Sequence, residues 1–145
     1  ENARYEDPYA GGVSNSIRYL AMSPRTNEMQ VEGLENLFCA GEKAGPLVGH
    51  TEAITNGTLA GYNAARCGFG MELLTLPREL AIGDAIAYVR EQMMTEEGIR
   101  YKYTYSGSVY FNRMKELGLY TTYVDAIKAK VDRLGLTGIY MKKLN

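Results

Sequence analysis

The stretch of residues 35–66 constrains the fold more than any other part of the chain. Its apolar run at 37–40 ends at Gly41, a pattern typical of a strand that is covered on both faces. From Thr51 the pattern predicts a helix, because small residues recur at intervals of three and four, and Cys-Gly-Phe-Gly at 67–70 is a helix stop. A helix face with almost no side chain lets another backbone or a flat ligand approach closely. These small residues are Ala53, Gly57, Ala60, Gly61 and Ala64.

The loop between this strand and this helix is where we expect chemistry. Strand-end loops that lead into the positive end of a helix commonly hold anions in α/β proteins. The backbone N–H groups of residues 49–52 are expected to donate to a phosphate or to a carbonyl of a cofactor ring, with His50 or Thr51 as the N-cap. His50 is the only histidine, and both a ligand contact and a plain loop position remain open for it.

Three segments of this stretch carry a family signature: Leu-Phe-Cys-Ala-Gly-Glu at 37–42, Gly-His-Thr-Glu at 49–52, and Gly-Thr-Leu-Ala-Gly-Tyr-Asn-Ala-Ala-Arg at 57–66. They resemble the last FAD-contacting segment of the glucose-inhibited-division-A superfamily, whose members are tRNA-modifying flavoproteins. Residues 76–89 are similar to the segment that follows in the folate-dependent tRNA uracil-5-methyltransferase branch. The resemblance covers residues 23–89.

This resemblance implies FAD as the cofactor and tRNA as a partner. The positions that it implies around the flavin are Gly41, Glu42, Gly49, His50, Thr51, Glu52 and Ala53. Two of them depart from the family pattern, which usually has Gln in place of Glu42 and Tyr in place of His50. A divergent paralogue and a true methyltransferase are both compatible with these departures. No cysteine matches a catalytic motif of the methyltransferases, so catalytic residues stay unassigned.

The chain begins with Glu1 and contains no Gly-x-Gly-x-x-Gly turn of the kind that a dinucleotide-binding fold needs. We therefore expect a piece of a longer flavoprotein that shares FAD with a missing N-terminal FAD-binding portion and is inactive alone. The expected fold class is α/β (α+β). Its expected parts are the last strand, loop and helix of a Rossmann-like domain (1–70), a connecting helix packed on it (71–97) and a small, basic, mostly helical subdomain with a hairpin-like strand pair (98–145).

Composition indicates an ordinary soluble globular protein, with 46% apolar residues and a net charge of −1 over 145 residues. No apolar run approaches the roughly 20 residues that a membrane span requires. Cys39 and Cys67 have neither metal-ligand spacing nor the pattern of a secreted disulfide framework. This cysteine usage favours a reducing cytoplasm and predicts no metal site.

Local signals predict three further helices. One starts near Pro77 and closes at Gly98, and the other two run over 109–117 and 121–134 before a glycine. The apolar stripe of the first falls at Ile82, Ile86, Val89 and Met93, and that of the last at Val124, Ile127, Val131 and Leu134. Both stripes are predicted to be buried.

The last third of the chain is basic, with nine Lys or Arg against three acids from residue 98 onward. Three tyrosines alternate with other residues in 101–105, which predicts a strand with one aromatic face that pairs with 137–141. Further short strands are expected at 17–22 and 28–32. Basic residues interleaved with aromatic ones favour RNA binding, although tyrosines that cover the core are the alternative. The candidate RNA contacts are Arg100, Lys102, Lys128 and Lys142.

Three classes of function follow from these observations. The first is part of an FAD-dependent enzyme that modifies tRNA, by uridine methylation or a related reaction. The second is an FAD-dependent oxidoreductase that acts on a small molecule. The third is a module that binds nucleic acid or another protein without catalysis of its own.

Overall fold

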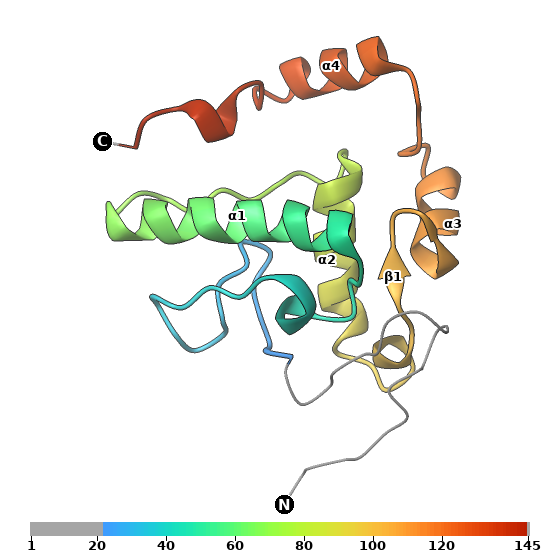
Figure 1. The fold of residues 1–145 in the computed structure, drawn as a ribbon, viewed down its shortest axis with the longest axis horizontal. Coiled ribbons are helices and arrows are strands. Elements are labelled where there is room, and N and C mark those ends of the chain that lie inside the picture. The colour runs from blue at the N-terminus through green and yellow to red at the C-terminus, as the bar shows by residue number, and fades with distance from the viewer. Residues whose placement is uncertain (1–21, 145) are drawn as a thin grey trace, which may run out of the picture.

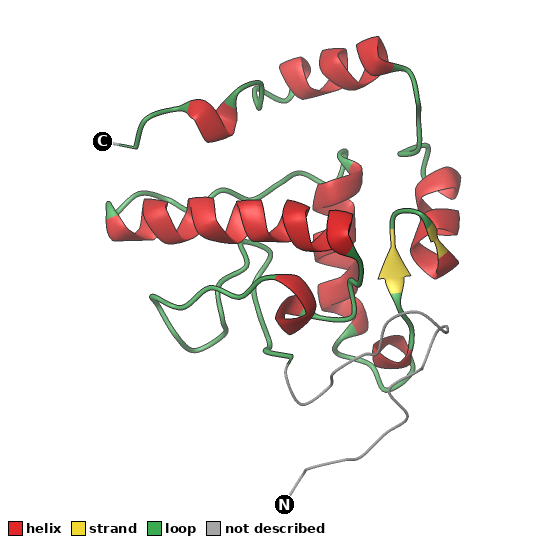
Figure 2. Cartoon of the chain, in the orientation of Figure 1, coloured by secondary structure: helices red, strands yellow, loops and turns green. Residues whose placement is uncertain are grey.

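The computed structural model describes residues 22–144 as a mainly helical chain with one short strand (Figures 1 and 2). The predicted strand at 17–22 therefore lies almost wholly outside the described residues. In chain order the elements are η2 (Gly41–Ala44), α1 (His50–Gly68), α2 (Ala81–Gln92), η3 (Gly98–Arg100), β1 (Tyr103–Thr104), α3 (Ser108–Glu116), α4 (Val124–Arg133) and η4 (Ile139–Met141).

Helices α1, α3 and α4 end at a glycine, as the sequence predicts. Gly70, Gly118 and Gly135 have φ angles of 65°, 64° and 70°, a left-handed conformation that glycine adopts at little cost. The N–H that follows each glycine donates to a carbonyl five residues earlier, from Met71 to Arg66 (2.9 Å), from Leu119 to Met114 (2.8 Å) and from Leu136 to Val131 (3.1 Å). These are Schellman-type caps, which the local chain specifies without any distant partner.

The strand predicted at 37–40 is not formed, and the described residues contain no sheet. Phe38 makes only an isolated antiparallel bridge with Gln30, and the Cys39 N–H donates to the Met29 carbonyl at 2.9 Å. Leu37 is 49% exposed, so the run is not covered on both faces. An extended segment becomes a strand where neighbours supply a ladder of hydrogen bonds, and the described chain supplies a single bridge at this run.

The predicted pairing of 101–105 with 137–141 is wrong. β1 pairs instead with the loop that precedes α1, where the Tyr103 N–H donates to the Pro46 carbonyl at 2.8 Å and the Val48 N–H donates to the Tyr103 carbonyl at 3.0 Å. The C-terminal segment forms the 3₁₀ turn η4 in place of a strand. β1 therefore positions the loop that leads into α1.

Helix α2 lies at the centre of the packing, between two apolar clusters. Ile86 belongs to one cluster together with Leu59 of α1. Val89 belongs to the other, together with Tyr103 and Tyr110. Ile86 and Val89 of the predicted stripe are therefore buried, whereas Ile82 and Met93 are half-buried. The helix is shorter than predicted at both ends, because residues 77–80 form a separate turn in front of it and it ends at Gln92, before Gly98.

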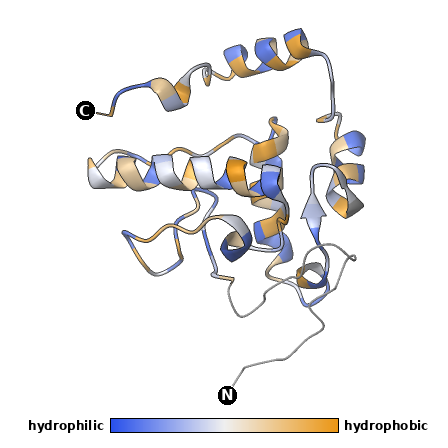
Figure 3. Ribbon diagram, in the orientation of Figure 1, coloured by the Kyte–Doolittle hydropathy of each residue, from blue (hydrophilic) through white to orange (hydrophobic). Residues whose placement is uncertain are grey.

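Helix α4 contains no buried residue, so the burial predicted for its stripe is wrong. Val124 and Ile127 are 60% and 43% exposed. Figure 3 shows hydrophobic residues along this helix, which belongs to the C-terminal arm of residues 120–144. The arm leads away from α3 and returns to α1 (Figure 1). There the Tyr140 and Tyr62 rings pack edge to face, with 5.1 Å between the ring centres. The apolar stripe thus lacks a partner along most of its length within the described chain.

Candidate functional site at the start of α1

Helix α1 begins at a glycine and has no side-chain cap. Gly49 is the N-cap residue, with a φ of 144°, and neither His50 nor Thr51 takes the capping role predicted for it. The Gly49 carbonyl accepts the first helical bond, from Ala53 at 2.9 Å. Within residues 22–144 no acceptor is found for the N–H groups of residues 50–52. Three backbone donors therefore point out of the positive end of the helix, beside the exposed side chains of His50 and Thr51.

The glycine turn at η2 lies alongside the first two turns of α1. The Gly41 N–H donates to Oδ1 of Asn56 at 2.8 Å, and a Cβ at Gly41 would lie 4.0 Å from that of Ala53. Asn56 is fully buried, and its Nδ2 has no hydrogen-bond partner in the described chain. The structure thus brings together the two predicted groups, Gly41 with Glu42 and Gly49 to Ala53. Asn56 was missed, although an asparagine inside a helix of small residues is itself a signal of a side chain bonded to the backbone.

Glu52 faces inward, not toward a ligand in solvent. Its side chain is 3% exposed, and its Oε1 accepts the Tyr105 N–H at 2.6 Å. The other carboxylate oxygen lies against Gly49, where a Cβ would collide with it. The carboxylate therefore ties the turn after β1 to the first turn of α1, and the glycine makes room for it.

Tyr105 is a second residue of this site that sequence reasoning did not identify. Its hydroxyl lies 3.2 Å from Oγ1 of Thr55 on α1. Burial, together with the charge of Glu52, raises the pKa of Tyr105 to about 12, so the phenol keeps its proton at neutral pH. The three tyrosines predicted on one strand face are in fact separated, because Tyr103 is buried in the core and Tyr101 is 41% exposed.

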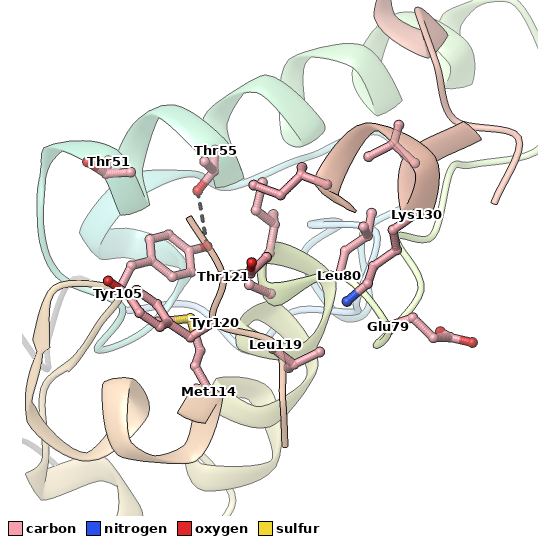
Figure 4. Close-up of a pocket in the computed structure, with 14 residues that line it drawn as sticks. Thr51, Thr55, Glu79, Leu80, Tyr105, Met114, Leu119, Tyr120, Thr121 and Lys130 are labelled. Atoms are coloured by element: carbon pink, nitrogen blue, oxygen red, sulfur yellow. Dashed lines mark hydrogen bonds between the residues drawn. The ribbon is translucent and has the colours of Figure 1, made fainter. Parts of the chain in front are cut away.

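An apolar cleft with a volume of about 580 Å³ opens next to these residues, between the start of α1, the start of α2, the end of α3 and α4 (Figure 4). Thr51, Thr55 and Tyr105 line one side of it. In Figure 4 the amino group of Lys130, from α4, points toward Leu80. The rest of the lining includes Met114, Leu119, Tyr120, Ile127 and Val131. The cleft therefore combines apolar walls with a few hydroxyl groups, one lysine and one glutamate, Glu79.

The basic residues predicted to contact RNA do not share one environment. Arg100, Lys128 and Lys142 are exposed. Lys102 is only 6% exposed, so its side chain is not on a surface that a phosphate can reach. The described residues hold no group of three or more His, Cys, Asp or Glu side chains that could bind a metal ion. None of the helices described has the length and apolar character that crossing a membrane requires.

Comparison with known proteins places these features in context. The sequence model of the family "Glucose inhibited division protein A" matches residues 1–72. The chain is similar to enzymes named methylenetetrahydrofolate–tRNA-(uracil-5-)-methyltransferase TrmFO. It is 45% identical over 60 residues to that of Bacillus pumilus, covering 41% of this chain and 14% of the relative. It is 41% identical over 91 residues to that of Natranaerobius thermophilus, covering 63% of this chain and 20% of the relative. The chain thus spans a fifth or less of the length of these curated relatives.

Proposed function

We propose that this chain, whose residues 1–72 match the glucose-inhibited division protein A family, forms part of an FAD-dependent enzyme that modifies tRNA. The observation that carries the proposal is that the family match extends through the whole of α1, whose start presents three backbone donors without an acceptor among residues 22–144, beside a glycine turn. The relatives' names support uridine methylation as the reaction on tRNA. Because the chain spans a fifth or less of these relatives' length, an FAD-binding portion elsewhere in a longer protein is the proposed partner.

The residues at the start of α1 fit the edge of a flavin ring. The N–H groups of residues 50–52 would hold a ring carbonyl, Gly41 adds no side chain beside them, and Gly49 leaves room for the Glu52 carboxylate. His50 and Thr51 are exposed beside these donors and would contact the ring or the substrate above it. When bound, FAD supplies the redox chemistry, and this part of the chain positions it.

A substitution at Gly49 tests the flavin assignment. Gly49→Leu in the full-length protein is expected to abolish FAD binding, because the φ of 144° and the neighbouring Glu52 carboxylate exclude a side chain there. The measurement is the ratio of flavin to protein absorbance after purification. Gly68→Ala, at the far end of α1 with open space around it, is the matched control. Full flavin occupancy in Gly49→Leu, with a normal far-ultraviolet circular dichroism spectrum, contradicts the assignment.

The tRNA assignment is tested by mass spectrometry of nucleosides from bulk tRNA of cells with and without the gene. Loss of 5-methyluridine, or of a wobble-uridine modification, is the expected result and identifies the reaction. An unchanged nucleoside profile contradicts a role in tRNA modification but leaves the flavin site standing.

The cleft beside α1 favours a second candidate, an FAD-dependent oxidoreductase that acts on a small molecule. Its volume of about 580 Å³ lies in the range typical of small-molecule sites, and its lining is mostly apolar with few polar groups. This candidate predicts that NADPH or NADH reduces the flavin, that the protein has no affinity for tRNA, and that the tRNA nucleosides are unchanged. Binding of tRNA by the full-length protein would count against it.

A further inference from the structure

We propose that Glu52 lowers the reduction potential of the bound flavin, because its buried charge opposes the positive end of α1. The inference rests on the proposed function, since it requires FAD to lie at the start of this helix. It goes further in assigning an electrostatic task to Glu52, whose buried carboxylate accepts the Tyr105 N–H.

The position of Glu52 sets the electric field at the start of α1. A helix N-terminus carries roughly half a positive charge, which would stabilise electron-rich, reduced FAD. Glu52 lies in the first turn and is 3% exposed, so its full negative charge offsets that field with little screening by water. The N–H groups of residues 50–52 then suit a neutral carbonyl better than an anion. The sequence-based expectation of a phosphate at this loop is correspondingly weakened.

Within residues 22–144 no cation is paired with Glu52. In this respect Glu52 differs from the other deeply buried carboxylate of these residues. Asp84 is 2% exposed, but it is paired with Arg113 at 2.8 Å and with Arg78 at 3.4 Å. Glu52 receives the Tyr105 N–H and is in no ion pair found for these residues. Its charge also acts on its surroundings, because it contributes to the raised pKa of Tyr105.

Adding electrons to FAD makes the ring more negative, and a neighbouring uncompensated carboxylate makes this addition less favourable. The flavin therefore becomes a stronger reductant. This property suits an enzyme whose flavin must pass electrons on to a substrate.

The test is the midpoint potential of FAD in the purified full-length protein, measured against a reference dye during stepwise reduction. Glu52→Gln is expected to raise the potential, because the amide keeps an oxygen for the Tyr105 N–H while the charge is lost. Glu52→Asp keeps the charge and is expected to stay near the wild-type potential. Glu116→Gln removes an exposed charge at the end of α3 and is the matched control.

A further variant protects the test against loss of FAD from Glu52→Gln. Thr55→Lys, three residues along α1, places a cation beside the carboxylate with Glu52 still in place, and it is also expected to raise the potential. An unchanged potential in both variants overturns the inference. A midpoint potential that shifts in Glu52→Asp but not in Glu52→Gln also overturns the inference, because Glu52 would then act only by holding the turn after β1. Wild-type protein without any FAD would overturn the proposed function itself, an outcome distinct from these.

Discussion

Asp84 shows at the residue scale how a buried charge is accommodated in this fold. The carboxylate lies in the first turn of α2, and Arg113 of α3 donates to both of its oxygens, at 2.8 and 2.9 Å. The Tyr110 hydroxyl adds a bond at 3.2 Å, and the Arg113 guanidinium stacks 4.2 Å from the centre of the Tyr88 ring. The hydrogen bonds to Asp84 raise the pKa of Arg113. This bidentate pair is one of the polar links between α2 and α3.

We expect Arg113→Met to lower the free energy of unfolding by about 3 kcal/mol, because it leaves a buried carboxylate without its main partner. Arg78→Met removes a half-exposed cation at 3.4 Å and is expected to cost less than about 1 kcal/mol. Urea denaturation of both variants measures the difference. The double variant Asp84→Asn with Arg113→Met should recover part of the loss. Equal losses in the two arginine variants would show that Arg113 has no special role.

At the scale of elements, α2 and α4 carry the same kind of apolar stripe with opposite outcomes. Ile86 of α2 is 1% exposed and lies between helices, whereas Ile127 of α4 is 43% exposed and lines the cleft. The spacing of apolar residues reports that a helix has an apolar face. It does not report whether the chain supplies something to cover that face.

This contrast predicts very different costs for the same substitution. Ile86→Ala is expected to lower the free energy of unfolding by about 2–5 kcal/mol, because it opens a cavity in the core. Ile127→Ala is expected to change it by about 0.5 kcal/mol or less. Thermal or urea denaturation of the two variants checks the prediction. A large loss in Ile127→Ala would show that another part of the full-length protein covers α4.

At the scale of the whole molecule, the basic charges of the last third are spread over the chain's surface and interior. Arg100, Lys128 and Lys142 lie on η3, on α4 and next to η4, and all three are exposed. Lys102 is buried. Binding of tRNA through phosphates would therefore use the first three residues and not the fourth.

We expect the triple variant Arg100→Gln, Lys128→Gln and Lys142→Gln to weaken tRNA binding by the full-length protein and to flatten its salt dependence. Each lost phosphate contact reduces the slope of log affinity against log salt by about 0.7–0.9, so the slope should fall by about 2–3. Lys102→Gln is expected to leave the slope unchanged, since its side chain is buried. Filter-binding titrations at several salt concentrations provide the comparison. A slope unaffected by the triple variant would place the tRNA surface elsewhere.

The sequence predicted those parts of the candidate site that depend only on neighbouring residues. Gly41 and Gly49 adopt positive φ angles, and residues 50–53 form the first turn of α1, as a glycine-bearing loop before a helix suggests. The two residues that complete the site come from longer-range contacts. Asn56 bonds to a loop 15 residues away, and Tyr105 meets Glu52 across 53 residues. No spacing pattern along the chain encodes such contacts.

The sequence by itself determined the ends of three helices, the apolar stripes and the family signature, because glycine conformation and side-chain periodicity act over a few neighbouring residues. Only the tertiary structure decided which stripe is buried, which extended segments find partners, and which charges are removed from water. Arg25 is an example, since it is 1% exposed and donates to the carbonyls of Ala44 and Ile86. Burial and pairing depend on what the rest of the chain brings alongside, and that is a property of the folded molecule.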